Sequence, residues 1–179
     1  MLLSGKKIFL RSLQTSDAGL LYKWENDKSI WSVSGTKKPF TKKEIKDFIA
    51  NQKDIYLDKQ LRLMICIPSP TGRRTKDEGI GCIDLFDYNE SDCSAGIGIL
   101  IADKKNRQNG YASEALELLI KHSFGKLHLL KLYCHVAENN IPSLKLFKKH
   151  KFKIKRKRSD ATNSRKKTAG EYFFQLLNT

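Results

Sequence analysis

The chain has 179 residues, of which 40% are hydrophobic, and its apolar content is enough for the core of a single domain over residues 1–179 and excludes a disordered chain. The formal net charge of +15 indicates an acidic ligand or partner, or simply a basic surface. No apolar run approaches the roughly 20 residues of a membrane helix, and residues 1–7 lack the apolar stretch of a signal peptide, so a cytoplasmic protein without membrane contact is expected.

The cysteines and histidines lack the spacing of metal ligands. Cysteines stand at positions 66, 82, 93 and 134 without a C-x-x-C pair, and histidines stand at 122, 128, 135 and 150 without an i, i+4 pair. We therefore expect no metal. The cysteines in apolar runs are interpreted as small core residues of a protein in a reducing compartment.

The first part of the chain predicts a strand followed by two helices. The strand is expected at residues 8–13. Residues 15–17 then offer capping oxygens for a helix that continues to about Asn26. A capping box at residues 41–44 opens the second helix.

The rest of the chain alternates between strands and helices. The expected elements are strands at 61–67, 79–86 and 94–102, with a turn at 87–92, then a long helix capped by Asn109 or an adjacent residue, a strand at 130–137, a helix from Asn140 to near Lys151, and strands at 152–157 and 171–177. The strand at 94–102 is almost wholly apolar, which suits burial on both faces. This order predicts an α/β chain with a mixed sheet and helices on its faces. The unit from Ala95 to Val136 implies a right-handed crossover.

The clearest chemical signal is the turn between residues 98 and 113, where a strand leads through a basic loop into a helix. The loop ends in Arg107-x-x-Gly110-x-Ala112. A helix N-terminus offers unpaired N–H groups and a partial positive charge, which suit a diphosphate, and small residues let phosphates approach the backbone. The alternative is a glycine-bearing helix start of the kind that any α/β fold contains.

This turn resembles the Gln/Arg-x-x-Gly-x-Gly/Ala motif of the GCN5-related N-acetyltransferase (GNAT) superfamily. The segment from Leu132 to Phe152 resembles that family's strand, Asn-x-x-Ser helix start and Lys-x-Gly-Phe ending. The N-terminal segments 10–13 and 17–27 are similar to the subgroup that contains ribosomal-protein and spermidine N-acetyltransferases. The resemblance covers nearly the whole chain and implies a mixed, mostly antiparallel sheet with helices on both faces and a splayed pair of parallel strands.

The resemblance also implies acetyl-CoA as co-substrate and assigns residues to it. The pantetheine arm would be lined by Ile99, Leu100 and Ile101, and the pyrophosphate would be held by Arg107, Gln108, Asn109, Gly110, Tyr111, Ala112 and Ser113. Asn140 matches an Asn that bonds to the coenzyme arm, and it can cap its helix as well. Lys149 matches a basic residue that reaches a phosphate, although a solvated lysine on a helix face is the favoured alternative.

Two positions depart from the family pattern. Lys151 replaces a Gly that ends the helix, so the turn is expected to be made differently. Phe147 replaces a Tyr that often protonates the leaving thiolate, and Phe has no proton to give. Tyr111, Tyr133 and Tyr172 are the candidate substitutes.

The catalytic base is not evident, because the pantetheine strand carries no carboxylate where many members have a Glu. Asp84 is the nearest alternative, and it is either a site residue or one half of a salt bridge, since a lone carboxylate in an apolar layer is costly. Glu25 and Asp27 lie where the subgroup shapes its acceptor pocket, although a solvated helix end is the favoured alternative for each. A backbone N–H near Ile99 would hold the oxyanion. Asp84 and Glu25 are thus the candidate catalytic residues.

The sequence predicts an N-acetyltransferase that acts on a small amine, a polyamine or a protein N-terminus. The alternatives are a CoA-binding module without catalysis and a basic protein that binds RNA or the ribosome. The basic segment 153–167 motivates the last, but a solvated hairpin is favoured for it because no aromatic residues alternate with the charges. A homo-oligomer is left open.

Overall fold

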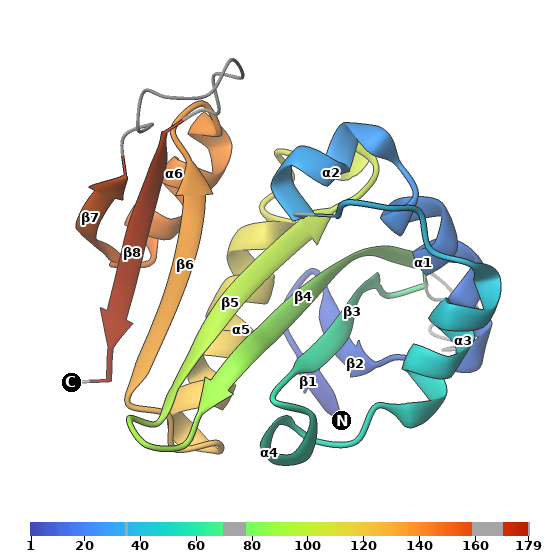
Figure 1. Ribbon diagram of the computed structural model, residues 1–179, viewed down its shortest axis with the longest axis horizontal. Coiled ribbons are helices and arrows are strands. Elements are labelled where there is room, and N and C mark those ends of the chain that lie inside the picture. Colours follow the sequence, from blue (N-terminus) through green and yellow to red (C-terminus); the bar gives the residue numbers. More distant parts are fainter. Residues whose placement is uncertain (35, 70–77, 159–169, 179) are drawn as a thin grey trace.

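The computed structural model describes residues 1–34, 36–69, 78–158 and 170–178 (Figure 1). In these ranges eight strands form one sheet in the order β1-β2-β3-β4-β5-β6-β8-β7. The strands are β1 (Leu2–Ser4), β2 (Phe9–Ser12), β3 (Leu61–Ile67), β4 (Glu78–Asn89), β5 (Ser94–Ile101), β6 (Lys131–Ala137), β7 (Lys153–Arg158) and β8 (Glu171–Leu177). The α-helices are α1 (Ala18–Glu25), α2 (Lys28–Ser34), α3 (Lys42–Asn51), α4 (Ile55–Asp58), α5 (Tyr111–Gly125) and α6 (Ile141–Lys149).

The sheet is mixed, with one parallel pair. Neighbouring strands pair antiparallel except β5 and β6, which are parallel and joined by α5. Figure 1 shows these two strands diverging toward their carboxyl ends. The predicted mixed, mostly antiparallel sheet is therefore confirmed.

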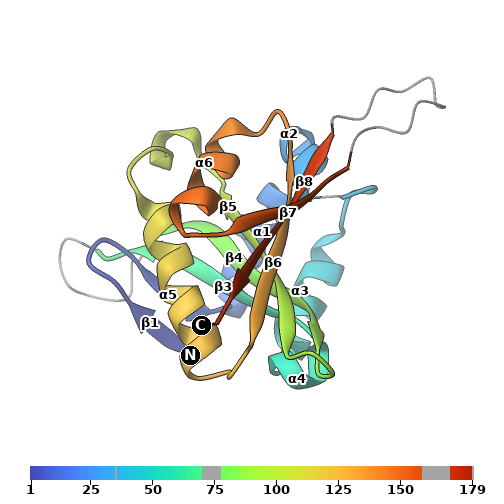
Figure 2. The same ribbon diagram turned by 90° about the vertical axis from the view of Figure 1, so that its left-hand side faces the viewer.

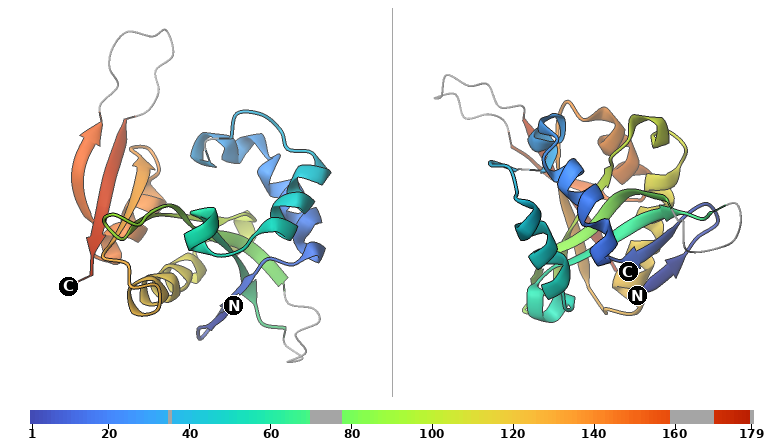
Figure 3. Two further views of the ribbon diagram at one scale, coloured as in Figure 1. Left: turned by 60° about the horizontal axis from the view of Figure 1, so that its bottom comes forward. Right: turned by 90° about the vertical axis from the view of Figure 1, so that its right-hand side faces the viewer.

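Helices cover both faces of the sheet (Figures 2 and 3). On β3, Leu63 and Ile65 belong to the core under α5 and α6, whereas Met64 and Cys66 belong to the core under α1 and α3. This alternation follows from the period of two along a strand. We call the second side the α1/α3 face.

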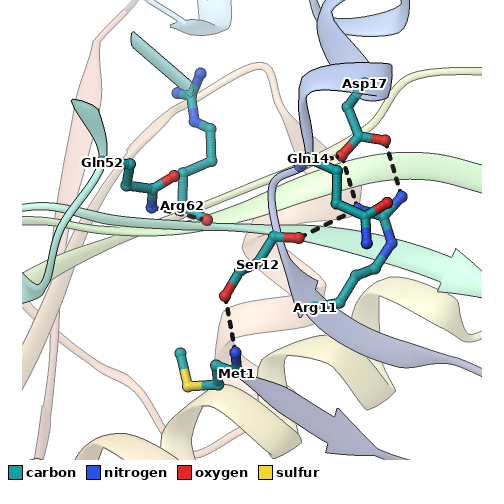
Figure 4. A network of polar contacts seen from close by, with 7 residues as sticks. All are labelled: Met1, Arg11, Ser12, Gln14, Asp17, Gln52 and Arg62. Atoms are coloured by element: carbon teal, nitrogen blue, oxygen red, sulfur yellow. Dashed lines mark hydrogen bonds and ion pairs between the residues drawn. The ribbon is translucent and has the colours of Figure 1, made fainter. Parts of the chain in front are cut away.

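The N-terminal segment that resembles the ribosomal-protein and spermidine subgroup has a structural role. Arg11 on β2 donates to both carboxylate oxygens of Asp17, over 2.6 and 2.8 Å, at the start of α1 (Figure 4). The same carboxylate accepts from the backbone N–H of Gln14. A bidentate arginine–carboxylate pair fixes direction as well as distance, so it sets how α1 leaves the sheet.

Several sequence expectations for local structure were wrong. The structure adds β1, α2 and α4, and a 3-10 turn at Thr15–Asp17, capped by Gln14, precedes α1. The N-cap of α5 is Gly110, with φ 84°, which is adjacent to Asn109, so the expectation of a cap at Asn109 or an adjacent residue is confirmed. The turn expected at 87–92 is shorter, since β4 continues to Asn89.

The end of α6 also corrects an expectation. Lys151 occupies the left-handed region itself, with φ 64°. The N–H of Lys151 donates to the carbonyl of Lys148, and the N–H of Phe152 donates to the carbonyl of Phe147, over 3.0 and 3.1 Å. The Phe147 and Phe152 rings lie 5.1 Å apart. This is a Schellman motif with its hydrophobic contact, so the turn is the usual one, made by a lysine in place of a glycine.

Among the described residues, no helix has both the length and the apolar character that crossing a membrane requires. No group of three or more His, Cys, Asp or Glu in those ranges has the arrangement of a metal site. All four cysteines are free thiols, and burial raises the pKa of Cys82 and of Cys134 above the ordinary value.

Candidate active site

The parallel strands separate after a short pairing. Within the described residues, β5 and β6 pair only from Ser94–Gly96 to Lys131–Tyr133. The first four residues of β5 are buried, and the last four are half-buried. The sequence had favoured burial of the strand at 94–102 on both faces. The structure corrects this for its second half, which is only half-buried. Its second half, which contains Ile99, Leu100 and Ile101, has no strand partner on the β6 side.

The loop after β5 contains a 3-10 turn at Lys104–Asn106 and leads into α5, whose first turn receives no hydrogen bond from a capping side chain. Gly110 is the N-cap of α5, and it offers no side chain to the first turn of that helix. The first intrahelical bond runs from the N–H of Glu114 to the carbonyl of Gly110. The N–H groups of Tyr111, Ala112 and Ser113 therefore precede the helical ladder, as the start of any helix requires. A 15-residue helix adds its dipole to these donors.

Two side chains of this loop, those of Arg107 and Asn109, donate to backbone carbonyls of residues 101–107. Arg107 donates from Nε to the carbonyl of Ile101 over 3.1 Å and from Nη2 to the carbonyl of Ala102 over 3.3 Å. Asn109 donates from Nδ2 to the carbonyls of Lys105 and Arg107. Gln108 is exposed and has a left-handed backbone with φ 64°. Arg107 and Asn109 thus fix the shape of the loop.

A polar cluster joins the start of α5 to the end of α6. The Ser113 hydroxyl lies 2.8 Å from Nε2 of His150 and accepts from Nζ of Lys149 over 3.1 Å. Burial, followed by the charge of Lys149, lowers the pKa of His150 below its ordinary value. Lys149 is exposed, yet its ammonium contacts Ser113 in the first turn of α5, so it is more than a solvated lysine on a helix face.

Lys7 contacts the turn, and Asn140 lies at the start of α6. Nζ of Lys7 donates to the backbone carbonyl of Asn109 over 3.3 Å. Asn140 accepts from the N–H of Ser143 over 3.3 Å and so caps α6. Sequence reasoning found Asn140 but missed Lys7 and His150. Lys7 stands in no recognisable pattern, and His150 fills the variable position of the Lys-x-Gly-Phe ending, where the pattern specifies no residue.

On the α1/α3 face, one arginine holds both candidate catalytic carboxylates. Arg62 on β3 lies 2.6 Å from Glu25 of α1 and 2.5 Å from Asp84 of β4. The three side chains are 17–21% exposed. Glu25 is therefore not a solvated helix end, which corrects the favoured expectation for it. Asp84 forms the salt bridge that had been one of its two interpretations.

The guanidinium of Arg62 is firmly fixed. Burial opposes its charge, but the attraction of Asp84, supported by Glu25, outweighs this and raises the pKa of Arg62. Its guanidinium lies 5.5 Å from the ring centre of Phe48 on α3. Its backbone carbonyl accepts from Gln52, as Figure 4 shows. The cluster of Arg62, Glu25 and Asp84 carries one net negative charge.

Asp27 is exposed beyond the end of α1. Its side chain accepts from the N–H of Ser29 over 2.9 Å. This hydrogen bonding, followed by the charges of Arg107 and Lys104, lowers the pKa of Asp27. The corner between α1 and α2 thus lies within electrostatic reach of the loop after β5.

Two residues of β5 on the α1/α3 face, Gly96 and Gly98, have no side chain. A Cβ on Gly96 would lie 2.3 Å from the Phe86 ring, so that ring already covers Gly96. A Cβ on Gly98 would lie 3.6 Å from Phe86 and 3.8 Å from the Asp84 carboxylate, which is ordinary contact. Asp84 is also the register partner of Gly98 on β4. The carboxylate and the aromatic ring therefore border the strand where it separates from β6.

The tyrosines considered as substitutes for the missing phenol lie in three places. Tyr111 begins α5, Tyr133 packs edge-on against Phe86, and the Tyr172 hydroxyl donates to Glu138 over 3.4 Å. Phe147 is buried and packs against Phe152. Tyr133 is thus the candidate that borders the same face as Asp84.

The basic segment 153–167 is only partly described. Its first residues form β7 at the edge of the sheet, where Lys153, Lys155 and Arg156 are exposed and Lys157 pairs with Glu138. Residues 159–169 lie outside the described residues. Exposed lysines on an edge strand are a common device against edge-to-edge pairing, so they do not by themselves indicate a partner.

Comparisons with known proteins identify the family and agree with the fold. The family described as "Acetyltransferase (GNAT) domain" matches residues 7–153. The Bacillus licheniformis protein named "Uncharacterized N-acetyltransferase p20" is 26% identical over 173 residues, which cover 96% of this chain and 93% of that protein. The Mus musculus protein named "Alpha/beta-tubulin-N-acetyltransferase 9" is 32% identical over 75 residues, covering 41% of this chain and 31% of that protein. The solved spermidine N-acetyltransferase from Vibrio cholerae, in complex with CoA and spermine, has a TM-score of 0.81 at 19% identity and covers 97% of this chain and 96% of that chain.

Proposed function

Because the chain belongs to the GNAT acetyltransferase family, we propose that it transfers the acetyl group of acetyl-CoA to a primary amine by direct attack in a ternary complex. The enzyme is an acyl-CoA-dependent N-acetyltransferase. The finer proposal is that residues 1–179 act as one acetyltransferase domain in the cytoplasm and that the acceptor amine is a protein N-terminus or a small amine.

The observation that carries the proposal is the combination of the separated strands with the uncapped helix start. The pyrophosphate would lie at the N–H groups of Tyr111, Ala112 and Ser113, because Gly110 lets it approach the backbone. Lys149 and Lys7 would add positive charge. The arm would lie along the second half of β5, whose backbone groups have no strand partner on that side. The residues present therefore fit acetyl-CoA, which supplies an activated acetyl thioester.

The acceptor would approach from the α1/α3 face, over Gly98. The net negative charge of Glu25, Asp84 and Arg62 would attract an ammonium to this position, although the chain as a whole is strongly basic. We propose that Asp84 and Glu25 take part in this way, by holding the acceptor. A carboxylate that is bonded to a guanidinium has fewer lone pairs left for proton abstraction.

The chemistry of the acceptor favours a protein N-terminus over a polyamine. An α-amino group has a pKa near 8, whereas an alkyl amine has a pKa near 10, so less free energy is needed to deprotonate the former. The overall charge of +15 would also slow the arrival of a polycation. The name of the mouse relative, which mentions tubulin, supports a protein acceptor. The V. cholerae structure in complex with spermine supports the alternative acceptor, a polyamine.

Thermal melting with and without acetyl-CoA tests the coenzyme part. At a concentration 100 times Kd, binding adds about 2.7 kcal/mol of stability, or roughly 5–10 °C for a chain of this size. Gly110→Glu should abolish the shift. Gly125→Glu is the matched control, since it places the same charge at the far end of α5, in open space. Equal shifts in both variants would contradict the assignment of the turn.

Thiol release from acetyl-CoA tests the acceptor. We would compare spermidine with a Met-initiated decapeptide and with the same peptide blocked at its N-terminus. The proposal expects turnover with the free peptide only. Turnover with spermidine but not with the peptide would contradict a protein acceptor and identify a polyamine acetyltransferase. A melting shift with acetyl-CoA but no turnover with either amine would favour a CoA-binding module without catalysis.

A further inference from the structure

A histidine–glutamate pair lies on the α1/α3 face, beside the point where β5 and β6 separate. Nδ1 of His135 on β6 lies 3.2 Å from Oε2 of Glu171 on β8. The two side chains are 42% and 40% exposed, so both are open to solvent. His135 stands in the strand of the segment 132–152 that resembles the family, Glu171 lies outside that segment, and the coenzyme assignment uses neither residue.

Strand register places this pair opposite Asp84 across β5. Residues opposite each other in a sheet share a face, and so do residues two apart along a strand. Asp84 is opposite Gly98, and Tyr133 is opposite Gly96. His135 therefore lies on the same face as Asp84, two residues beyond the last pairing of β5 with β6.

The imidazole is held in place by its neighbours. Its ring centre lies 5.0 Å from that of Phe173, its register partner on β8, and 6.2 Å from that of Tyr133. With a proton on Nδ1, His135 donates to Glu171, and Nε2 is left as the lone-pair acceptor. A carboxylate on the far nitrogen fixes the tautomer and stabilises the imidazolium that forms when Nε2 takes a proton.

We propose that His135 is the general base that takes the proton from the acceptor amine, and that Glu171 is its positioning residue. This inference rests on the proposed function and identifies the group that the pantetheine strand lacks. Asp84 and Glu25 hold the ammonium from the β4 side, and His135 receives its proton from the β6 side, directly or through one water. Gly98 of β5 lies on the same face, opposite Asp84.

The proton balance follows from the reaction. An ammonium acceptor loses two protons: one leaves through Nε2 of His135 to solvent, and the other ends on the thiol of CoA. The amine nitrogen forms a bond to the acetyl carbon while the carbon–sulfur bond breaks. The products are an amide, a thiol and one proton, and His135 returns to its starting state.

Kinetics of matched histidine variants test the base. His135→Gln should lower kcat/KM for the Met-initiated decapeptide about 100-fold at pH 7, because general-base catalysis contributes roughly 10²–10⁴-fold. His128→Gln changes an exposed histidine in the connection before β6, and it should stay within about twofold of wild type. Both variants should keep the melting shift with acetyl-CoA.

Glu171→Gln tests positioning, because it keeps the shape and removes the charge. It should lower kcat about 10-fold and displace the acid limb of the pH profile, whereas Glu171→Asp should restore part of the rate. The titratable groups that face His135 are Glu171 of β8 and Tyr133 of its own strand, and Arg156 of β7 is the register partner of Phe173. A merely structural role for Glu171 would leave the pH profile unchanged.

A readout without turnover completes the experiment. The ring signal of His135 in a proton–carbon NMR spectrum, assigned by its loss in His135→Gln, should move when the decapeptide is added to CoA-bound protein. Wild-type kcat/KM in His135→Gln, or a ring signal that the peptide does not move, would overturn the base assignment while the proposed function stands. Absence of wild-type turnover with every amine would overturn the proposed function and this inference together.

Discussion

Replacing Lys151 by glycine should stabilise the protein. Lys151 has φ 64° at the end of α6. A left-handed backbone costs an L-residue about 1–2 kcal/mol, and glycine avoids this cost but loses about 0.5–1 kcal/mol more chain entropy on folding. The net gain is about 0.5–1 kcal/mol. A chain of this size gains about 2–4 °C in melting temperature per kcal/mol of stability, so the midpoint of thermal unfolding should rise by about 1–4 °C.

Thermal and urea unfolding of three variants would check this prediction. Lys151→Ala removes the same charge but keeps Cβ, so it should gain nothing. Lys145→Gly places glycine inside α6, where the backbone is helical, and should cost about 1 kcal/mol. If Lys151→Ala stabilised as much as Lys151→Gly, relief of charge repulsion would be the cause and the reasoning from backbone strain would be refuted.

Three further predictions concern the site, the thiols and the pH. Gly98→Ala should keep the melting temperature within about 2 °C, since its Cβ meets only ordinary contacts, yet raise KM for the acceptor, as steady-state kinetics would show. Iodoacetamide should label the half-buried Cys93 in the native state, with Cys82 and Cys134 protected until unfolding, because burial raises their pKa; mass spectrometry reads this out. The lowered pKa of His150 means that the unfolded chain binds more protons, so stability should fall as the pH drops below about 6.5, and melting curves of His150→Gln should show a shallower fall.

The backbone of the turn between β5 and α5, which we propose as the coenzyme site, was predictable because its physics is local. A strand, a basic loop, a glycine and a helix start are adjacent in sequence, and Gly110 adopts the backbone that its position requires. The predicted bounds of the strands at 61–67 and 171–177 match the structure. The short elements β1, α2 and α4 were missed because three to seven residues carry too little periodicity to stand out.

At the proposed acceptor end, the sequence singled out Asp84 and Glu25, but their side-chain partners could not be predicted, because strand register determines them. Arg62 is a single charge inside an apolar strand, and only the pairing of β3 with β4 shows that it opposes Asp84. His135 and Glu171 are 36 residues apart and meet only because β8 inserts beside β6. The order of strands in a sheet is long-range information that alternation within one strand does not contain.

This difference implies that the two halves of the reaction can change independently. The pyrophosphate turn depends on α5, α6 and the loop between β5 and α5, whereas the acceptor face depends on side chains from β3, β4, β6 and α1 that point the other way. A double-mutant cycle of Arg62→Gln with Lys149→Ala should therefore give additive effects on kcat/KM, because the two residues share no partner. An interaction energy of more than about 1 kcal/mol between the two substitutions would contradict this independence. It would mean that one structural element affects both the acceptor and the coenzyme, and β5, which lies between the two faces, would be that element.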